Sequence, residues 1–171
     1  GAVIEYTPNM MPDGVTARIA WAPSSGGNSG DKASSGAQSG AVAEGSGYDI
    51  TLEIGDAMSG ISGLTVYGGI SSTEQDAAGS TVEGDLDSET IGIKYAFGDF
   101  TLGYQWSEED LGLSSGVDRY ENVGYGITFQ VNDDLSLGYN NYESEQSNIG
   151  GAAVTAEASS FQVAYTMGGA S

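Results

Sequence analysis

Large apolar side chains alternate with small or polar ones along much of this chain. The clearest example spans residues 89–107, where the apolar positions are Ile91, Ile93, Tyr95, Phe97, Phe100, Leu102, Tyr104 and Trp106. A period of two places all of them on one face of an extended strand. The Gly98-Asp99 pair that separates the two runs is typical of a tight turn. We therefore predict an antiparallel hairpin with one bulky apolar face and one face of small and polar residues.

The same alternation recurs in seven other segments. They predict strands at residues 2–6, 15–21, 48–54, 64–71, 119–131, 135–140 and 160–167. With the hairpin, this makes about nine strands and no helix of convincing length. Short turns are expected at residues 8–14, 55–62, 98–99 and 132–134, and long polar loops at residues 23–47, 73–88, 108–118 and 143–156. Short turns at one end of the strands and longer loops at the other are typical of outer-membrane barrels.

Three observations favour a membrane barrel over a soluble β-sandwich or solenoid, which strand count alone would favour. No charged residue lies on the apolar face of a clear strand, and the opposite face is too small and polar to fill a dry core. Aromatic residues gather near strand ends, as in the interfacial girdles of such barrels. The predicted girdle consists of Tyr6, Trp21, Tyr48, Phe97, Phe100, Trp106, Phe129 and Tyr165.

These patterns predict an all-β fold, an antiparallel up-and-down transmembrane β-barrel. Residues 1–171 form a single barrel domain or a fragment of one, and residues 23–47 form a long Gly/Ser-rich loop on the extracellular side. Small wall residues favour a wide barrel with an aqueous lumen over one of about eight strands. Nine strands are an odd number and bacterial barrels have even numbers, so we expect the chain to be part of a larger barrel.

Composition excludes several classes of function. The chain has 171 residues, with 24 acidic and four basic side chains and a net charge of -20, which argues against a nucleic-acid partner. No apolar run approaches the roughly 20 residues of a membrane-spanning helix. Histidine and cysteine are absent, which rules out His-based triads, thiol nucleophiles and zinc sites that use those ligands.

The acidic residues do not form a convincing catalytic or metal site. Asp49 and Glu53 share a face four residues apart, about 13 Å along a strand, which is wider than the roughly 5–9.5 Å of a glycosidase pair. The stretch 83–89, EGDLDSE, has oxygen-rich spacing that suits calcium but lacks the full EF-hand pattern. A solvated acidic loop and a calcium site both stay open for it. We expect no enzymatic activity and no cofactor.

Charged and aromatic residues on the small, polar face are the candidate pore lining. They are Arg18, Asp49, Glu53, Tyr67 and Lys94. Opposed charges create a field across a lumen, and an excess of acidic groups favours cations. We therefore predict passive, cation-preferring diffusion of small hydrophilic solutes and ions.

Three segments resemble the general diffusion porins of alphaproteobacteria, including the type abundant in marine members. They read SETIGIKYAFGDFTLGYQW, YENVGYGITFQVNDDLSLGYNNYES and ASSFQVAYTMGGAS, and the resemblance extends from Tyr48 to the end of the chain. It implies a 16-stranded barrel, a homotrimer in contact with outer-membrane lipid, and a constriction loop folded into the lumen. A terminal strand that ends in an aromatic residue and a segment matching the constriction loop are both missing, which fits a partial sequence.

Two other functions remain open from the sequence. One is a small closed eight-stranded barrel in the outer membrane, with a structural or adhesive role and no conductance. The other is a secreted, soluble β-rich surface or filament protein, whose apolar faces would meet each other.

Overall fold

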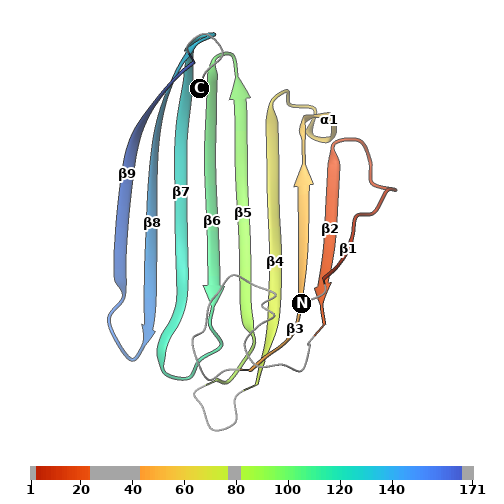
Figure 1. Ribbon diagram of the computed structural model, residues 1–171, viewed down its shortest axis with the longest axis vertical. Helices are drawn as coiled ribbons and strands as arrows, with labels where there is room; N and C mark the ends of the chain where they lie inside the picture. Colours follow the sequence, from red (N-terminus) through yellow and green to blue (C-terminus); the bar gives the residue numbers. More distant parts are fainter. Residues whose placement is uncertain (1–2, 24–42, 77–81, 167–171) are drawn as a thin grey trace.

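Nine antiparallel strands form a single sheet, in which each strand pairs with its neighbours in sequence order (Figure 1). The computed structural model describes residues 3–23, 43–76 and 82–166. The strands are β1 (Ile4–Tyr6), β2 (Val15–Ala22), β3 (Ala43–Ile54), β4 (Leu64–Asp76), β5 (Leu86–Phe97), β6 (Phe100–Asp110), β7 (Gly116–Asn132), β8 (Leu135–Ile149) and β9 (Val154–Tyr165). This up-and-down arrangement confirms the predicted fold class. The predicted strand residues Ala2 and Met167 lie outside the described part of the chain.

All four short turns lie at one end of the sheet, the upper end in Figure 1. We call this the turn end and the opposite end the loop end. Gly98 has φ +53° in the two-residue β5–β6 turn, a conformation that glycine adopts without strain. The predicted turn at 55–62 contains a single helical turn, α1 (Asp56–Ser59), and no helix in the described ranges is long and apolar enough to cross a membrane.

The strands continue further toward the loop end than predicted. Residues 43–47 of the predicted loop 23–47 belong to β3, and residues 24–42 lie outside the described part of the chain. The other three predicted loops are also shorter, because residues 73–76, 86–88, 108–110, 116–118, 143–149 and 154–156 lie in strands. These extensions are polar on both faces except for isolated residues such as Leu86, Val117, Ile149 and Val154, so hydrophobic alternation does not reveal them. The backbone hydrogen bonds of the ladder nevertheless continue through them.

Cross-strand partners share a face of the sheet, so the register defines two faces. The apolar face includes a row through Ala17, Leu52, Gly68, Ile91, Trp106 and Val123. The polar face includes the adjacent row through Arg18, Thr51, Gly69, Thr90, Ser107, Asn122 and Ser144. The predicted division into a bulky face and a small, polar face therefore holds across the sheet.

Apolar residues form an oblique band across the apolar face. The ladder leads from Tyr48, the apolar residue nearest the loop end of β3, to Ser147 of β8. The continuous apolar run of that face on β8 ends at Tyr139, and beyond it only Ile149, at the end of the strand, is apolar. The offset of eight residues is about 26 Å, against about 24 Å for five interstrand spacings. At the turn end, the row of cross-strand partners that begins at Ile54 of β3 reaches Asn141 of β8. Leu135, the apolar residue nearest the turn end of β8, lies six residues from Asn141. The band is therefore inclined to the strands' perpendicular by about 40–47°.

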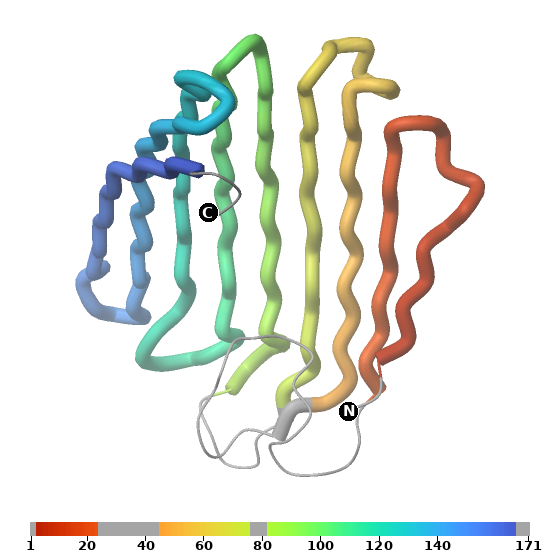
Figure 2. The backbone as a smooth tube through the Cα atoms, turned by 45° about the horizontal axis from the view of Figure 1, so that its top comes forward, coloured from red at the N-terminus to blue at the C-terminus, as the bar shows by residue number. Residues whose placement is uncertain are grey.

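The apolar band is not covered by other parts of the described chain. Within these residues only two hydrophobic side chains are buried, Leu86 and Leu111. Side chains throughout the band are exposed, including Ile91 at 55% and Phe161 at 68%. The sheet also curves, with β8 and β9 turning away from the plane of the central strands (Figure 2). A single curved sheet with an uncovered apolar face differs from a soluble sandwich, whose two sheets bury their apolar faces against each other.

Candidate functional site

The five predicted lining residues lie together on the polar face of β2 to β5. Arg18 pairs with Thr51, and Asp49 and Glu53 lie two residues to either side of Thr51 on the same face. Glu53 pairs in turn with Tyr67. The sequence placed these charges on one face, and the register adds that Arg18 is flanked by two carboxylates on the neighbouring strand.

Lys94 completes this group on the next strand. It pairs with Thr65 and lies two residues from Gly92, the partner of Tyr67. Arg18 and Lys94 are both exposed, whereas Asp49 is half-buried. The group therefore offers charged side chains of both signs along one stretch of the sheet.

Two adjoining hollows lie along the polar face. The first, which we call the acidic hollow, has a volume of 640 Å³ and is lined by Asp49 and Glu109 together with serine and threonine residues. The second, the neutral hollow, has a volume of 520 Å³ and no charged residue in its lining. Its polar-face residues are Tyr67, Gly103, Gln105, Ser107, Asn122, Gly124, Gly126, Asn140, Tyr142, Ala158 and Ser160.

Hydroxyl groups hold three carboxamides in the neutral hollow. The Tyr67 hydroxyl donates to Gln105 Oε1 at 2.9 Å. The Tyr142 hydroxyl donates to Asn122 Oδ1 at 2.6 Å, and the Ser160 hydroxyl donates to Asn140 Oδ1 at 2.6 Å. Of these residues, only Tyr67 was predicted as a site residue. Its partner Gln105 lies two strands away on β6, and the other two pairs join neighbouring strands. The proximity of these residues therefore depends on a register that composition and spacing do not reveal.

Carboxylates line up on the apolar face at the loop end, beyond the apolar band. Glu89, Glu108, Glu121 and Glu145 are successive cross-strand partners on β5 to β8, and Glu143 faces Glu157. The prediction that the apolar face carries no charge is therefore wrong for the full strands, which are longer than the alternating segments. All these carboxylates lie on the loop side of the continuous apolar run on this face of their strands.

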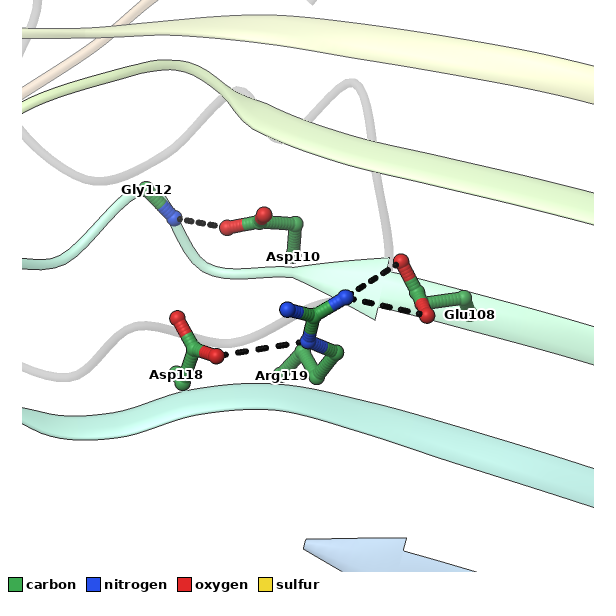
Figure 3. A network of polar contacts seen from close by, with 5 residues as sticks. All are labelled: Glu108, Asp110, Gly112, Asp118 and Arg119. Carbon is green, nitrogen blue, oxygen red and sulfur yellow. Dashed lines mark hydrogen bonds and ion pairs between the residues drawn. The ribbon is translucent and has the colours of Figure 1, made fainter. Parts of the chain in front are cut away.

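Arg119 lies among the carboxylates at the loop end of the sheet (Figure 3). Its Nε donates to Asp118 Oδ2 at 3.3 Å, and its Nη1 lies 3.4 Å from Glu108 Oε1. The hydrogen bond that Arg119 donates to Asp118 and the charge of Glu108 raise the pKa of Arg119 above its ordinary value. In the sequence, Arg119 only begins a predicted strand, although its position beside Asp118 and near Glu121 is a signal for such a network.

A small buried cluster lies at the loop end of the polar face. Thr73 and Leu86 are cross-strand partners, each 2% exposed, and Leu111 is 6% exposed. The Gln75 side chain donates to the carbonyl oxygen of Leu111 at 2.8 Å, and the backbone N–H of Gly84 donates to the carbonyl of Gly112 at 3.1 Å. The segments predicted as solvated acidic loops are therefore partly packed here, and their isolated leucines were the available signal.

The predicted girdle residues all lie on the apolar face or at its ends. Phe97, Phe100 and Phe129 form a stacked row at the turn end, with ring centroids 5.6 Å and 4.7 Å apart. Trp21 and Tyr48 are cross-strand partners near the loop end. The remaining three, Tyr6, Trp106 and Tyr165, are partners of Ile19, Ile91 and Leu135.

The acidic stretch 83–89 is divided between a loop and β5, which begins at Leu86. In the described ranges, no group of three or more carboxylates is arranged to hold a metal ion. Instead, the sheet has a long polar wall with exposed charges and hydrogen-bonding groups on one face, and an uncovered apolar band on the other.

Comparison with known proteins relates nearly the whole chain to one family. The family model described as Gram-negative porin matches residues 1–170. No curated protein matches the chain. The match covers all nine strands, including the part before Tyr48 that had shown little resemblance.

Proposed function

The chain belongs to the Gram-negative porin family, which makes it an outer-membrane protein that passes small solutes by diffusion without catalysing a reaction, and we propose that its pore prefers cations. Family membership decides against both alternatives, the soluble surface protein and the small barrel without conductance. The preference for cations rests on the charges of the polar face, which we take as the lumen wall.

The observation that carries this proposal is the excess of carboxylates on the polar face. Glu5, Asp49, Glu53 and Glu109 share that face with Arg18 and Lys94. Glu5 pairs with Ala20, the partner of Asp49, so three carboxylates surround Arg18 on β1 to β3. A lumen lined in this way attracts cations more than anions, because its carboxylates outnumber the bases that oppose them.

Reversal potentials in a tenfold KCl gradient test the preference. We expect the complete protein in a planar bilayer to show the sign of a cation-selective pore. The double variant Asp49→Asn/Glu53→Gln should move the reversal potential toward zero, and Arg18→Gln should move it the other way. Glu121→Gln/Glu145→Gln, which removes two carboxylates from the opposite face outside the acidic hollow, is the matched control and should have a smaller effect. An anion-selective sign in the unaltered protein would overturn the proposal.

We also propose that the chain contributes to a larger barrel of the general diffusion type found in alphaproteobacteria. The open sheet supports this, because β1 and β9 are not paired with each other in the described residues. Backbone groups at an open edge are costly in hydrocarbon, so further strands must cover both edges within the membrane. Aromatic residues at both ends of the band support an interfacial girdle.

A homotrimer is the assembly we propose, with contact through small residues of the apolar face. Ala17 and Gly68 lie in one cross-strand row, separated by Leu52. Around Gly68 the apolar face has a depression of 530 Å³, whose lining includes Ile70, Ile91 and Trp106. Gly68→Trp should lower the proportion of trimer on gels run without heating, whereas the same substitution at Ile127, on the same face of β7, should leave it unchanged.

A further inference from the structure

Two tyrosine rings lie along the polar face from opposite sides of β6. Tyr67, Gly92, Gln105, Gly124 and Tyr142 are successive cross-strand partners on β4 to β8. A Cβ atom built on Gly92 would overlap Cζ of Tyr67, so this ring covers Gly92 on β5.

The second ring mirrors the first. A Cβ built on Gly124 would lie 3.7 Å from Cδ2 of Tyr142, so this ring leans over β7. Because β5 and β7 are two interstrand spacings apart, the rings are separated by about 10 Å, with Gln105 between them. Both rings retain exposed surface, and Tyr142 is 48% exposed.

Oriented carboxamides surround the two rings. The hydroxyls of Tyr67, Tyr142 and Ser160 occupy the oxygens of Gln105, Asn122 and Asn140. Within the described residues, the three amide nitrogens have no side-chain or backbone acceptor. Each amide is thus held by its oxygen and keeps N–H donors available for a ligand.

Charge is absent from the lining of this hollow, although the chain carries 24 acidic residues. The acidic hollow next to it contains Asp49 and Glu109 and shares Gln105, Ser107 and Asn122 with it. The polar wall is therefore divided into a region that suits cations and a region that suits neutral solutes. Aromatic faces combined with a few placed amide donors are the composition of a small-molecule site.

We propose that the neutral hollow is a binding site for a neutral sugar of about two pyranose rings. The apolar C–H faces of the sugar would stack on the rings of Tyr67 and Tyr142, and its hydroxyl oxygens would accept from the amides of Gln105, Asn122 and Asn140. A hollow of 520 Å³ accommodates a ligand of this size. This inference rests on the proposed function, because it takes the polar face as the lumen wall.

Sugar-induced block of ion current tests the site in the complete protein in a planar bilayer. We expect maltose to reduce the KCl current at lower concentrations than sorbitol, an open-chain polyol that has no ring face to stack. Tyr67→Ala and Tyr142→Ala should each raise the half-blocking concentration of maltose about fivefold, the change expected for one lost aromatic contact. Tyr120→Ala is the matched control, since Tyr120 lies on the same face in the acidic hollow, and it should leave the block unchanged.

The outcomes separate this inference from the porin function. Normal KCl current with equal block by maltose and sorbitol would overturn the sugar site alone, and this comparison needs no variant. Unchanged maltose block in both tyrosine variants would also overturn it. If Tyr67→Ala does not insert, Gln105→Ala replaces it, because removal of the central amide should weaken maltose block as well. Absence of any KCl current would overturn the proposed pore and the sugar site together.

Discussion

Glycine at position 92 is what allows the Tyr67 ring to lie along the polar face. Gly92 is buried under this ring, and Tyr67 reaches across β5 to hydrogen-bond Gln105 on β6. A bare backbone and an aromatic ring thus complement each other across the strands, as glycines and aromatic residues do elsewhere in β-sheets. The ring gives the polar face a flat surface at this point, while the Tyr67 hydroxyl still donates to the side-chain amide of Gln105.

Substitution of Gly92 by alanine tests this contact at the scale of one residue. We expect Gly92→Ala to displace the ring, since the added methyl would overlap its outer atoms. The fold should survive, because a tyrosine can swing away. Loss of the packing and of one hydrogen bond should lower the free energy of unfolding by about 1–2 kcal/mol, measured by urea unfolding in lipid.

Gly103→Ala is the matched control for this measurement. Gly103 lies on the polar face of the next strand, as the partner of Lys94, and a Cβ there has no atom within 4 Å. Its free energy of unfolding should change by no more than about 0.5 kcal/mol. Equal losses in the two variants would show that the Tyr67 contact contributes nothing beyond the change of glycine to alanine in a strand.

At the scale of the strand, the sequence predicts the faces well and the ends poorly. A period of two assigns each side chain to a face wherever one face is apolar, and Arg18, Asp49, Glu53, Tyr67 and Lys94 were placed on the correct face for this reason. The loop-end extensions lack that contrast. In β8, residues 143–149 are polar on both faces except at Ile149, so nothing in their pattern distinguishes a strand from a loop.

The sequence also could not predict which residues are cross-strand partners. The register shifts between Val117 and Arg119 and again between Gln130 and Asn132. Such irregularities change which residues face each other and have no mark in hydrophobic periodicity. The pairing of Tyr142 with Gly124, and with it the neutral hollow, therefore required the structure.

The depth of the apolar band can be tested on a single strand. Ile93 lies in the middle of the band on β5, and Glu89 lies four residues away on the same face, beyond the band. Ile93→Lys should lower the free energy of unfolding in lipid by about 2–4 kcal/mol, because the charge would face hydrocarbon. Glu89→Lys should change it by no more than about 1 kcal/mol, as expected for a charge near the interface. A loss at position 89 as large as that at position 93 would place Glu89 within the membrane.

At the scale of the whole molecule, the ladder and the apolar band give two independent directions. Hydrogen bonds define rows perpendicular to the strands, whereas the band has to follow the membrane plane if its side chains face lipid. The angle between them is therefore the tilt of the strands from the membrane normal. Transmembrane barrels require strands tilted by roughly 35–45°, and the inclination of the band, about 40–47°, agrees with the upper part of that range without any assumption about the number of strands.

Polarised infrared spectroscopy of oriented membranes measures this tilt directly. From the offsets of six and eight residues at the two edges of the band on β8, we expect the dichroism of the amide I band to give an average strand tilt of about 40–47°. Strands tilted by less than about 25° would contradict the argument, because Tyr48 and Tyr139 would then lie at very different depths and could not both mark the same edge of the hydrocarbon. In that case the carboxylates Glu143 and Glu157 would lie level with Ile91 and Trp106, where lipid cannot solvate them. The tilt is thus the feature that keeps every carboxylate of the apolar face on the water side of the membrane.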